Sequence, residues 1–192
     1  MRRVSQFLVL GLGFCVTQVG WSAHVAGASP TAMTQTHVGA NVQGVVHGLL
    51  PVAADPGPEE RLAMVNLARS QRRTCGGTVY PAAPPLKWDA RLEAAARGQS
   101  EYQSQIRTMT HDGAGGADMG ERITTAGFPW RSVAENVGWN YPNASDMLQG
   151  WLASPGHCVN IMRPTLTHVG WARVDAYDTM DLARLRAPTK KS

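Results

Sequence analysis

The segment from Ser154 to Cys158, with the sequence Ser-Pro-Gly-His-Cys, constrains the fold more than any other. It follows an amphipathic run that ends at Leu152. Proline disrupts the interior of a helix and glycine adopts backbone angles that other residues avoid, so the pattern predicts a turn. His157 is therefore expected at the mouth of that turn and not on the face of a helix. Cys158 would hold the turn in place if it pairs with another cysteine.

The N-terminus has the pattern of a secretory signal peptide. Arginines at positions 2 and 3 precede an apolar run over 7–19, and small residues follow at 26–28. This arrangement predicts that residues 1–28 are removed and that the mature protein is secreted to the periplasm or the extracellular space. The apolar run is short of the ~20 residues that a transmembrane helix needs. A lipoprotein signal would use Cys15, but the bulky residue before it disfavours that alternative.

Removal of the signal peptide would leave Cys75 and Cys158 as the remaining cysteines. An exported chain meets an oxidising environment, where two remaining cysteines usually pair. The sequence therefore predicts a Cys75–Cys158 disulfide. The alternative is a nucleophilic thiol at Cys158 activated by His157. It is disfavoured because adjacent residues seldom point their side chains at each other and a bridged sulfur is not a nucleophile.

Composition narrows the organisation and the partners of the chain. The hydrophobic content of 43% is sufficient for a buried core, and the net charge of +4 is modest. Basic residues do not alternate with aromatic residues along any stripe, so no nucleic acid partner is expected. Residues 29–56 are predicted to be a flexible spacer and 185–192 a basic tail. This leaves 57–184 as a single domain, which we expect to be a monomer without a transmembrane span.

Apolar periodicity and capping residues predict the elements of this domain. Helices are expected from Pro58 to just before the glycines at 76 and 77, from Asp89 to about 109, and over 118–126 and 145–152. Strands are expected over 167–174 and 178–183, paired as a hairpin. The chain has no His-Glu-x-x-His helix and no Gly-x-Ser-x-Gly elbow, so the common protease and esterase signatures are absent.

Several short motifs carry a family resemblance. They are Trp88-Asp89, His111-Asp112, Arg122-Ile123 with Ala126-Gly127-Phe128, Ala134-Glu135-Asn136, Trp151 with the segment from Ser154 to Met162, and Val169-Gly170-Trp171-Ala172. In this order they resemble the CAP superfamily of secreted proteins, also called SCP-like. The superfamily includes cysteine-rich secretory proteins, antigen 5 and pathogenesis-related 1 proteins. The chain resembles the bacterial YkwD-like branch, over about 58–184.

The resemblance implies an α+β fold, a three-layer α-β-α sandwich with a central antiparallel sheet and an open cleft. It places His111, Glu135 and His157 in that cleft. Some family members bind a divalent metal, often zinc, through the histidine pair, which makes His111 and His157 the candidate ligands here. Animal members carry a second glutamate shortly after the tryptophan that corresponds to Trp151. This chain has Ser154 there, so the second acid is missing.

Two functions fit the resemblance. The favoured one is a secreted, non-catalytic module that binds a lipid, a cell-wall fragment or a protein in its cleft. The competing one is a metal-assisted hydrolase or peptidase, with zinc-bound water on His111 and His157 and with Glu135 as the base. A simpler interpretation is that both histidines hydrogen-bond to Glu135 and hold the cleft together. The missing second acid favours a binding module over an enzyme.

Overall fold

The computed structural model describes residues 55–187. The predicted signal peptide, nearly all of the predicted spacer and the last residues of the basic tail lie outside this range. Within 55–187, no helix combines the length and the apolar character that crossing a membrane requires.

A four-stranded sheet forms the centre of the domain. Its strands are β3 (Lys87–Trp88), β4 (Trp130–Trp139), β5 (His168–Val174) and β6 (Tyr177–Leu185), in the spatial order β3-β5-β6-β4. The pairs β4–β6 and β5–β6 are antiparallel, and the short β3 runs parallel to β5. The predicted α+β fold is therefore confirmed, with one parallel pair at the edge of the sheet.

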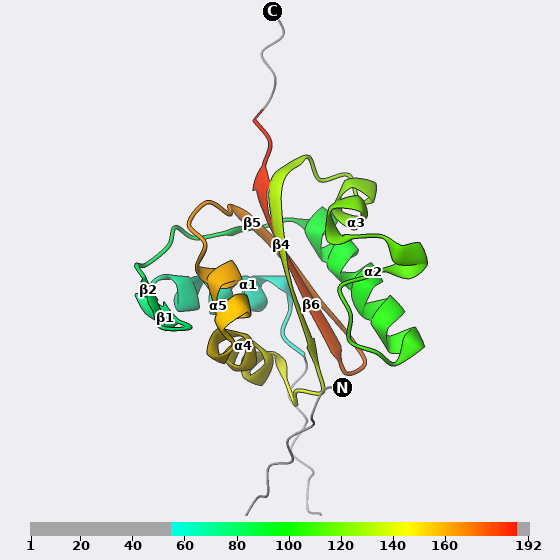
Figure 1. Ribbon diagram of the computed structural model, residues 1–192, viewed down its shortest axis with the longest axis horizontal. Coiled ribbons are helices and arrows are strands. Elements are labelled where there is room, and N and C mark those ends of the chain that lie inside the picture. Colours follow the sequence, from blue (N-terminus) through cyan, green and yellow to red (C-terminus); the bar gives the residue numbers. More distant parts are fainter. Residues whose placement is uncertain (1–54, 188–192) are drawn as a thin grey trace, which may run out of the picture. The chain divides into compact units, whose positions relative to one another are not determined.

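Helices cover both faces of the sheet (Figure 1). One face carries α2 (Ala90–Ile106) and α3 (Met119–Thr125), and the other carries α1 (Pro58–Arg69), α4 (Ala144–Ala153) and α5 (Pro155–Met162). A small hairpin of β1 (Arg73–Cys75) and β2 (Thr78–Tyr80) lies beside α5. The sequence pattern predicted helix as far as Cys75 and an irregular connection from Thr78. Both predictions are wrong here, because α1 ends at Arg69 and the residues on either side of Gly76 and Gly77 pair as β1 and β2.

The helix ends follow the local sequence. Helix α2 begins at Asp89, whose carboxylate accepts a hydrogen bond from the Arg91 backbone N–H at 2.9 Å. It ends at Arg107, which has a left-handed backbone with φ of 53°. Such a residue reverses the chain direction at a helix C-terminus, so the segment after α2 turns back toward the sheet.

The close approach of α2 to the sheet depends on Gly170 in β5. A Cβ atom at this position would overlap the backbone of Leu92 and Glu93. On the same face, Leu92 packs with Ile123, Phe128 and other residues in the smaller core cluster. The larger cluster fills the opposite face, where the Trp151 and Trp171 ring centroids lie 5.0 Å apart. The two cores fix both helical layers on the sheet.

The turn predicted at Pro155 and Gly156 is wrong, because these residues begin α5. Pro155 occupies the first turn of the helix, where its missing N–H costs nothing and its fixed φ suits the helix. Ser154 ends α4 and precedes α5, and its carbonyl accepts a hydrogen bond from the Cys158 N–H at 2.9 Å. His157 therefore lies on a helix and not at the mouth of a loop.

Candidate functional site

The three residues predicted for the cleft line one open hollow of about 630 Å³. His111 comes from the loop after α2, Glu135 from the edge strand β4, and His157 from the first turn of α5. Thr78 and Tyr80 of the β1–β2 hairpin also line the wall. The hollow thus collects residues from both helical layers, and their roles in function stay predictions.

Helix α2 holds the loop that carries His111. The Gln99 side-chain amide, buried on α2, donates hydrogen bonds to the carbonyl oxygens of Thr110 at 2.7 Å and Asp112 at 3.2 Å. These carbonyls flank His111 on either side. One amide group therefore fixes the backbone position of the histidine from below.

His111 and Glu135 form the central pair of the cleft. The His111 Nδ1 atom lies 2.8 Å from the Glu135 Oε1 atom. The Glu135 side chain is buried, whereas 56% of the His111 side chain is exposed. The hydrogen bond to Glu135 raises the pKa of His111, and partial burial opposes this effect. The pair therefore favours an imidazolium that rests on a buried carboxylate and faces the hollow.

Arg122 completes the pairing of Glu135. Its guanidinium forms an ion pair with the Glu135 Oε2 atom and donates hydrogen bonds to the carbonyl oxygens of His111 at 3.0 Å and Ala117 at 2.8 Å. Helix α3 thus fixes both the carboxylate and the histidine loop. Sequence reasoning gave Arg122 no role. A buried acid in an apolar run requires a cation, but the chain pattern did not show which arginine supplies it.

His157 differs from His111 in its electrostatic environment. Partial burial, and then the charge of His111, lower the pKa of His157. The Asn136 side chain donates to the His157 carbonyl at 3.2 Å and accepts from Asn160 at 2.9 Å. Asn160 also donates to the Glu135 carbonyl at 3.2 Å. Two asparagines therefore connect α5 to β4. The lowered pKa favours a neutral imidazole of His157 at the cleft.

The structure contains the disulfide between Cys75 and Cys158, with a Cα–Cα distance of 5.5 Å. Both cysteines are buried. The bridge joins the β1–β2 hairpin to α5, the helix that carries His157. Gly76, with φ of 56°, packs against Pro155 so closely that a Cβ atom would lie 2.8 Å from the proline Cβ. Cys158 is thus a structural residue and not a free nucleophile.

We expect the two cleft histidines to titrate on opposite sides of the ordinary value of 6.5. The His111 pKa is raised on folding, so its contribution to stability is complete below the unfolded value and is lost as the pH rises through the folded pKa. NMR titration of the imidazole protons measures both groups. Glu135→Gln should lower the His111 pKa, and indistinguishable titration of the two histidines would contradict the assignment.

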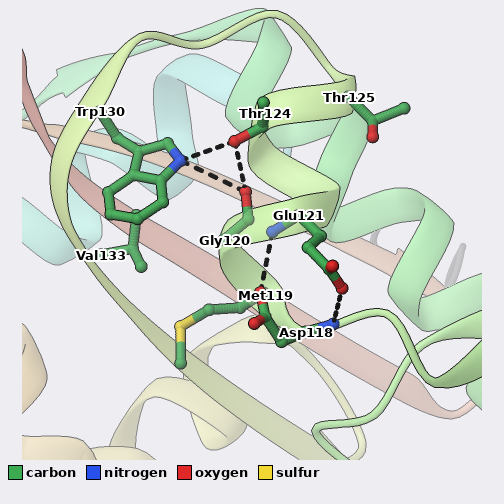
Figure 2. A pocket seen from close by; sticks show the side chains of 8 residues that line it. All are labelled: Asp118, Met119, Gly120, Glu121, Thr124, Thr125, Trp130 and Val133. Carbon is green, nitrogen blue, oxygen red and sulfur yellow. Dashed lines mark hydrogen bonds between the residues drawn. The ribbon is translucent and has the colours of Figure 1, made fainter.

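A second hollow of about 630 Å³ lies between α3 and β4 (Figure 2). Its two acids cap α3: the Glu121 N–H donates to Asp118 at 2.8 Å, and the Asp118 N–H donates to Glu121 at 2.9 Å. The Trp130 indole donates to the Gly120 carbonyl and to the Thr124 hydroxyl. These polar groups already have partners within the helix and strand. Glu121 therefore does not replace the missing second acid of the cleft.

The described residues do not complete a metal site at the cleft. Zinc sites in proteins use three or four protein ligands. His111 and His157 supply two imidazoles, but both oxygens of Glu135 are already engaged by His111 and Arg122. Within residues 55–187, no group of three His, Cys, Asp or Glu side chains is placed to hold an ion. The zinc expected from the resemblance thus lacks a third ligand in this part of the chain.

Two curated proteins of Bacillus subtilis strain 168 are similar to parts of the chain. The uncharacterized protein YkwD is 24% identical over 92 residues, which cover 48% of this chain and 36% of YkwD. The uncharacterized membrane protein YlbC is 26% identical over 85 residues, which cover 44% of this chain and 25% of YlbC. The matched segment spans well under half the length of either relative.

Solved structures share the fold. An extracellular protein with an SCP domain from Bacillus anthracis str. Ames has a TM-score of 0.52 and 26% identity, over 53% of this chain and 34% of that one. An outer surface protein from Borrelia burgdorferi has a TM-score of 0.52 and 15% identity, over 68% of this chain and 97% of that one. A cysteine-rich secretory protein from Staphylococcus aureus subsp. aureus Mu50 has a TM-score of 0.50 and 14% identity. The match covers 70% of this chain and 40% of that one. The last two likenesses concern the fold alone.

A family model agrees with this fold. The model of the cysteine-rich secretory protein family, CAP, matches residues 62–183, which is more than half of the chain. The matched range includes the strands and helices that place His111, Glu135 and His157 around the hollow. The chain belongs to the CAP family.

Proposed function

We propose that this protein is a secreted, non-catalytic CAP module that binds a polar, anionic ligand in the cleft. A cell-wall fragment has this chemistry, and it fits the cleft better than a lipid tail does. The proposal rests on how the carboxylate of Glu135 is bound by its neighbours. Among residues 55–187 it is the one acid that lines the hollow, and His111 and Arg122 engage its two oxygens. Each of its oxygens already accepts from a cationic partner, which makes the carboxylate a weak general base.

The groups that face the hollow suit recognition. His111 is exposed and carries a raised pKa, so its imidazolium can meet an anionic group. His157, Thr78 and Tyr80 offer an imidazole and two hydroxyls for hydrogen bonds to hydroxyl and amide groups. Ligand pockets usually combine a few such placed polar groups with a preformed wall.

An extracytoplasmic location supports this proposal. Disulfides such as Cys75–Cys158 form and persist in oxidising compartments. The Bacillus anthracis relative is described as an extracellular protein. A cleft of this chemistry outside the cytoplasm would meet cell-wall material directly.

Binding can be measured by NMR titration of the exported protein with muropeptides and, separately, with phospholipid vesicles. We expect muropeptides to shift the signals of His111 and His157. Their combined replacement by alanine should weaken binding at least tenfold, since the loss of two hydrogen bonds to a charged ligand costs well over a factor of ten. His168→Ala is the matched control, because His168 packs on Phe128 and does not line the hollow. Muropeptide binding that survives the double replacement would refute the proposed site.

One observation favours the metal-assisted hydrolase as a second candidate. The carboxylate engages the Nδ1 atom of His111 and leaves the other ring nitrogen free, as at many metal-binding histidines. Calorimetry with zinc separates the two functions. Stoichiometric zinc binding that is lost in the double alanine variant, together with turnover lost in Glu135→Gln, would replace the binding proposal. If the wild type does not bind zinc, the metal-assisted hydrolase is ruled out.

A further inference from the structure

A second carboxyl group lies beneath the cleft, from Asp181 in the middle of β6. Its partners across the sheet are Glu135 in β4 and Gly170 in β5. Directly paired residues of antiparallel strands point to the same face, with Cβ atoms about 4.5–5.5 Å apart. Asp181 and Glu135 therefore stand side by side on the face that α2 and α3 cover. Gly170, on the other side, has no side chain.

Asp181 has no access to solvent, and within residues 55–187 it forms no ion pair. Its relative exposure is 0%, and within the described part of the chain neither carboxyl oxygen has a hydrogen-bond partner. An ionised carboxylate in this state would cost several kcal/mol. A charge on Asp181 would therefore have no compensating interaction in the described structure.

The charges around the pair decide which acid ionises. Arg122 from α3 and His111 from the loop after α2 both bind Glu135. On the β5 side of Asp181 stands Gly170, which carries no charge. Two adjacent carboxyl groups do not both ionise at moderate cost. The cations keep the charge on Glu135, so Asp181 is left with the proton.

The titration behaviour of Asp181 agrees with this geometry. Burial, and then the charge of Glu135 beside it, raise the pKa of Asp181 well above its usual value, and Arg122 opposes the shift. A protonated Asp181 has one O–H group to donate, and the Glu135 carboxylate is the acceptor next to it.

We propose that Asp181 is a positioning residue that stays protonated at neutral pH, donates its proton in a hydrogen bond to Glu135, and holds that carboxylate under His111. It is the second acid of this site, although it comes from the central sheet and not from the helix where animal relatives carry theirs. Because it is buried, it acts through Glu135 and touches no ligand. The inference does not depend on which ligand the cleft takes.

Carbon-13 NMR of the aspartate carboxyl groups tests the protonation state directly. Across pH 4 to 8, as a rough working range around the ordinary aspartate and histidine values, the Asp181 signal should remain that of a protonated carboxyl group above the pH at which aspartates ordinarily ionise. Its absence in Asp181→Asn assigns the signal. Ionisation of Asp181 at the ordinary aspartate value would overturn the proposal.

Stability provides a second readout. The folded pKa of Asp181 lies above the unfolded value near 3.8, so the stability linked to its proton is present at low pH and is lost as the pH rises toward the folded pKa. One proton corresponds to a tenfold change in the unfolding equilibrium constant per pH unit. The folding equilibrium constant of Asp181→Asn should therefore gain about tenfold per pH unit over that of the wild type in this range. Parallel curves for Asp181→Asn and the wild type would overturn the proposal.

The positioning role has its own signature. Asparagine is neutral and still donates to Glu135, so Asp181→Asn should leave the His111 pKa unchanged in metal-free buffer. Asp181→Val removes the donor and should lower the His111 pKa toward its ordinary value. A drop of a unit or more in Asp181→Asn would mean that the wild-type group is charged, and would overturn the proposal even if the valine variant does not fold.

Discussion

Replacing Arg122 by methionine is expected to lower the free energy of unfolding by about 3–5 kcal/mol at pH 8, because a buried carboxylate loses its cation. The guanidinium pairs with Glu135 and also holds the carbonyl oxygens of His111 and Ala117. Methionine fills similar space but offers no donor. At pH 6 the loss should be smaller, since protonated His111 then compensates part of the charge on Glu135.

Urea denaturation at the two pH values measures this effect. Arg131→Met is the matched control, because Arg131 is exposed on β4, the strand that carries Glu135. Its replacement should change the free energy of unfolding by no more than about 0.5 kcal/mol. Equal losses for Arg122→Met and Arg131→Met would show that the ion pair with Glu135 contributes little.

Removing the disulfide is expected to cost about 4 kcal/mol of stability by the loop-entropy relation, because the bridge closes a separation of 83 residues. The suitable variant combines Cys75→Ala with Cys158→Ala, since both side chains are buried among apolar residues. The structural effect should centre on α5, which the bridge anchors to the β1–β2 hairpin. The NMR signals of His157 should therefore broaden or shift more than those of His111.

Thermal unfolding with and without a reducing agent gives the control. The reductant should lower the midpoint of the wild type and leave that of the double variant unchanged. Mass spectrometry of the unreduced, exported protein should show a linked peptide that contains Cys75 and Cys158. Two free thiols in that protein would contradict the prediction.

The sequence predicted the long helices and the final hairpin because their signals are local. Asp89 as a cap and the apolar spacing after it define α2, and alternation defines β5 and β6. Strand β3 was missed because Lys87 and Trp88 form a strand only by pairing with His168 and Val169 of β5. The break at Pro155 was misread, since the same residue that disrupts a helix interior also fits a helix start.

Residue type and family resemblance were enough to predict part of the candidate site. These named His111, Glu135 and His157, which the structure brings to one hollow. They did not reveal Arg122 or Asp181, because the roles of these residues depend on contacts across elements. The pairing of Asp181 with Glu135 follows from strand register, and the reach of Arg122 to Glu135 follows from how α3 packs on β4. Neither is encoded in a short segment.

Strand β4 lies at the edge of the sheet, with one row of its backbone groups turned away from β6. The carbonyl oxygens of Glu135 and Val137 belong to this row, and they accept hydrogen bonds from Asn160 and from the Trp151 indole. Open edges invite a strand from another molecule, which begins aggregation. A strand approaching β4 would first have to displace these side chains of α4 and α5. Helix α4, together with the helix α5 that also lines the cleft, thereby protects the domain against edge-to-edge polymerisation.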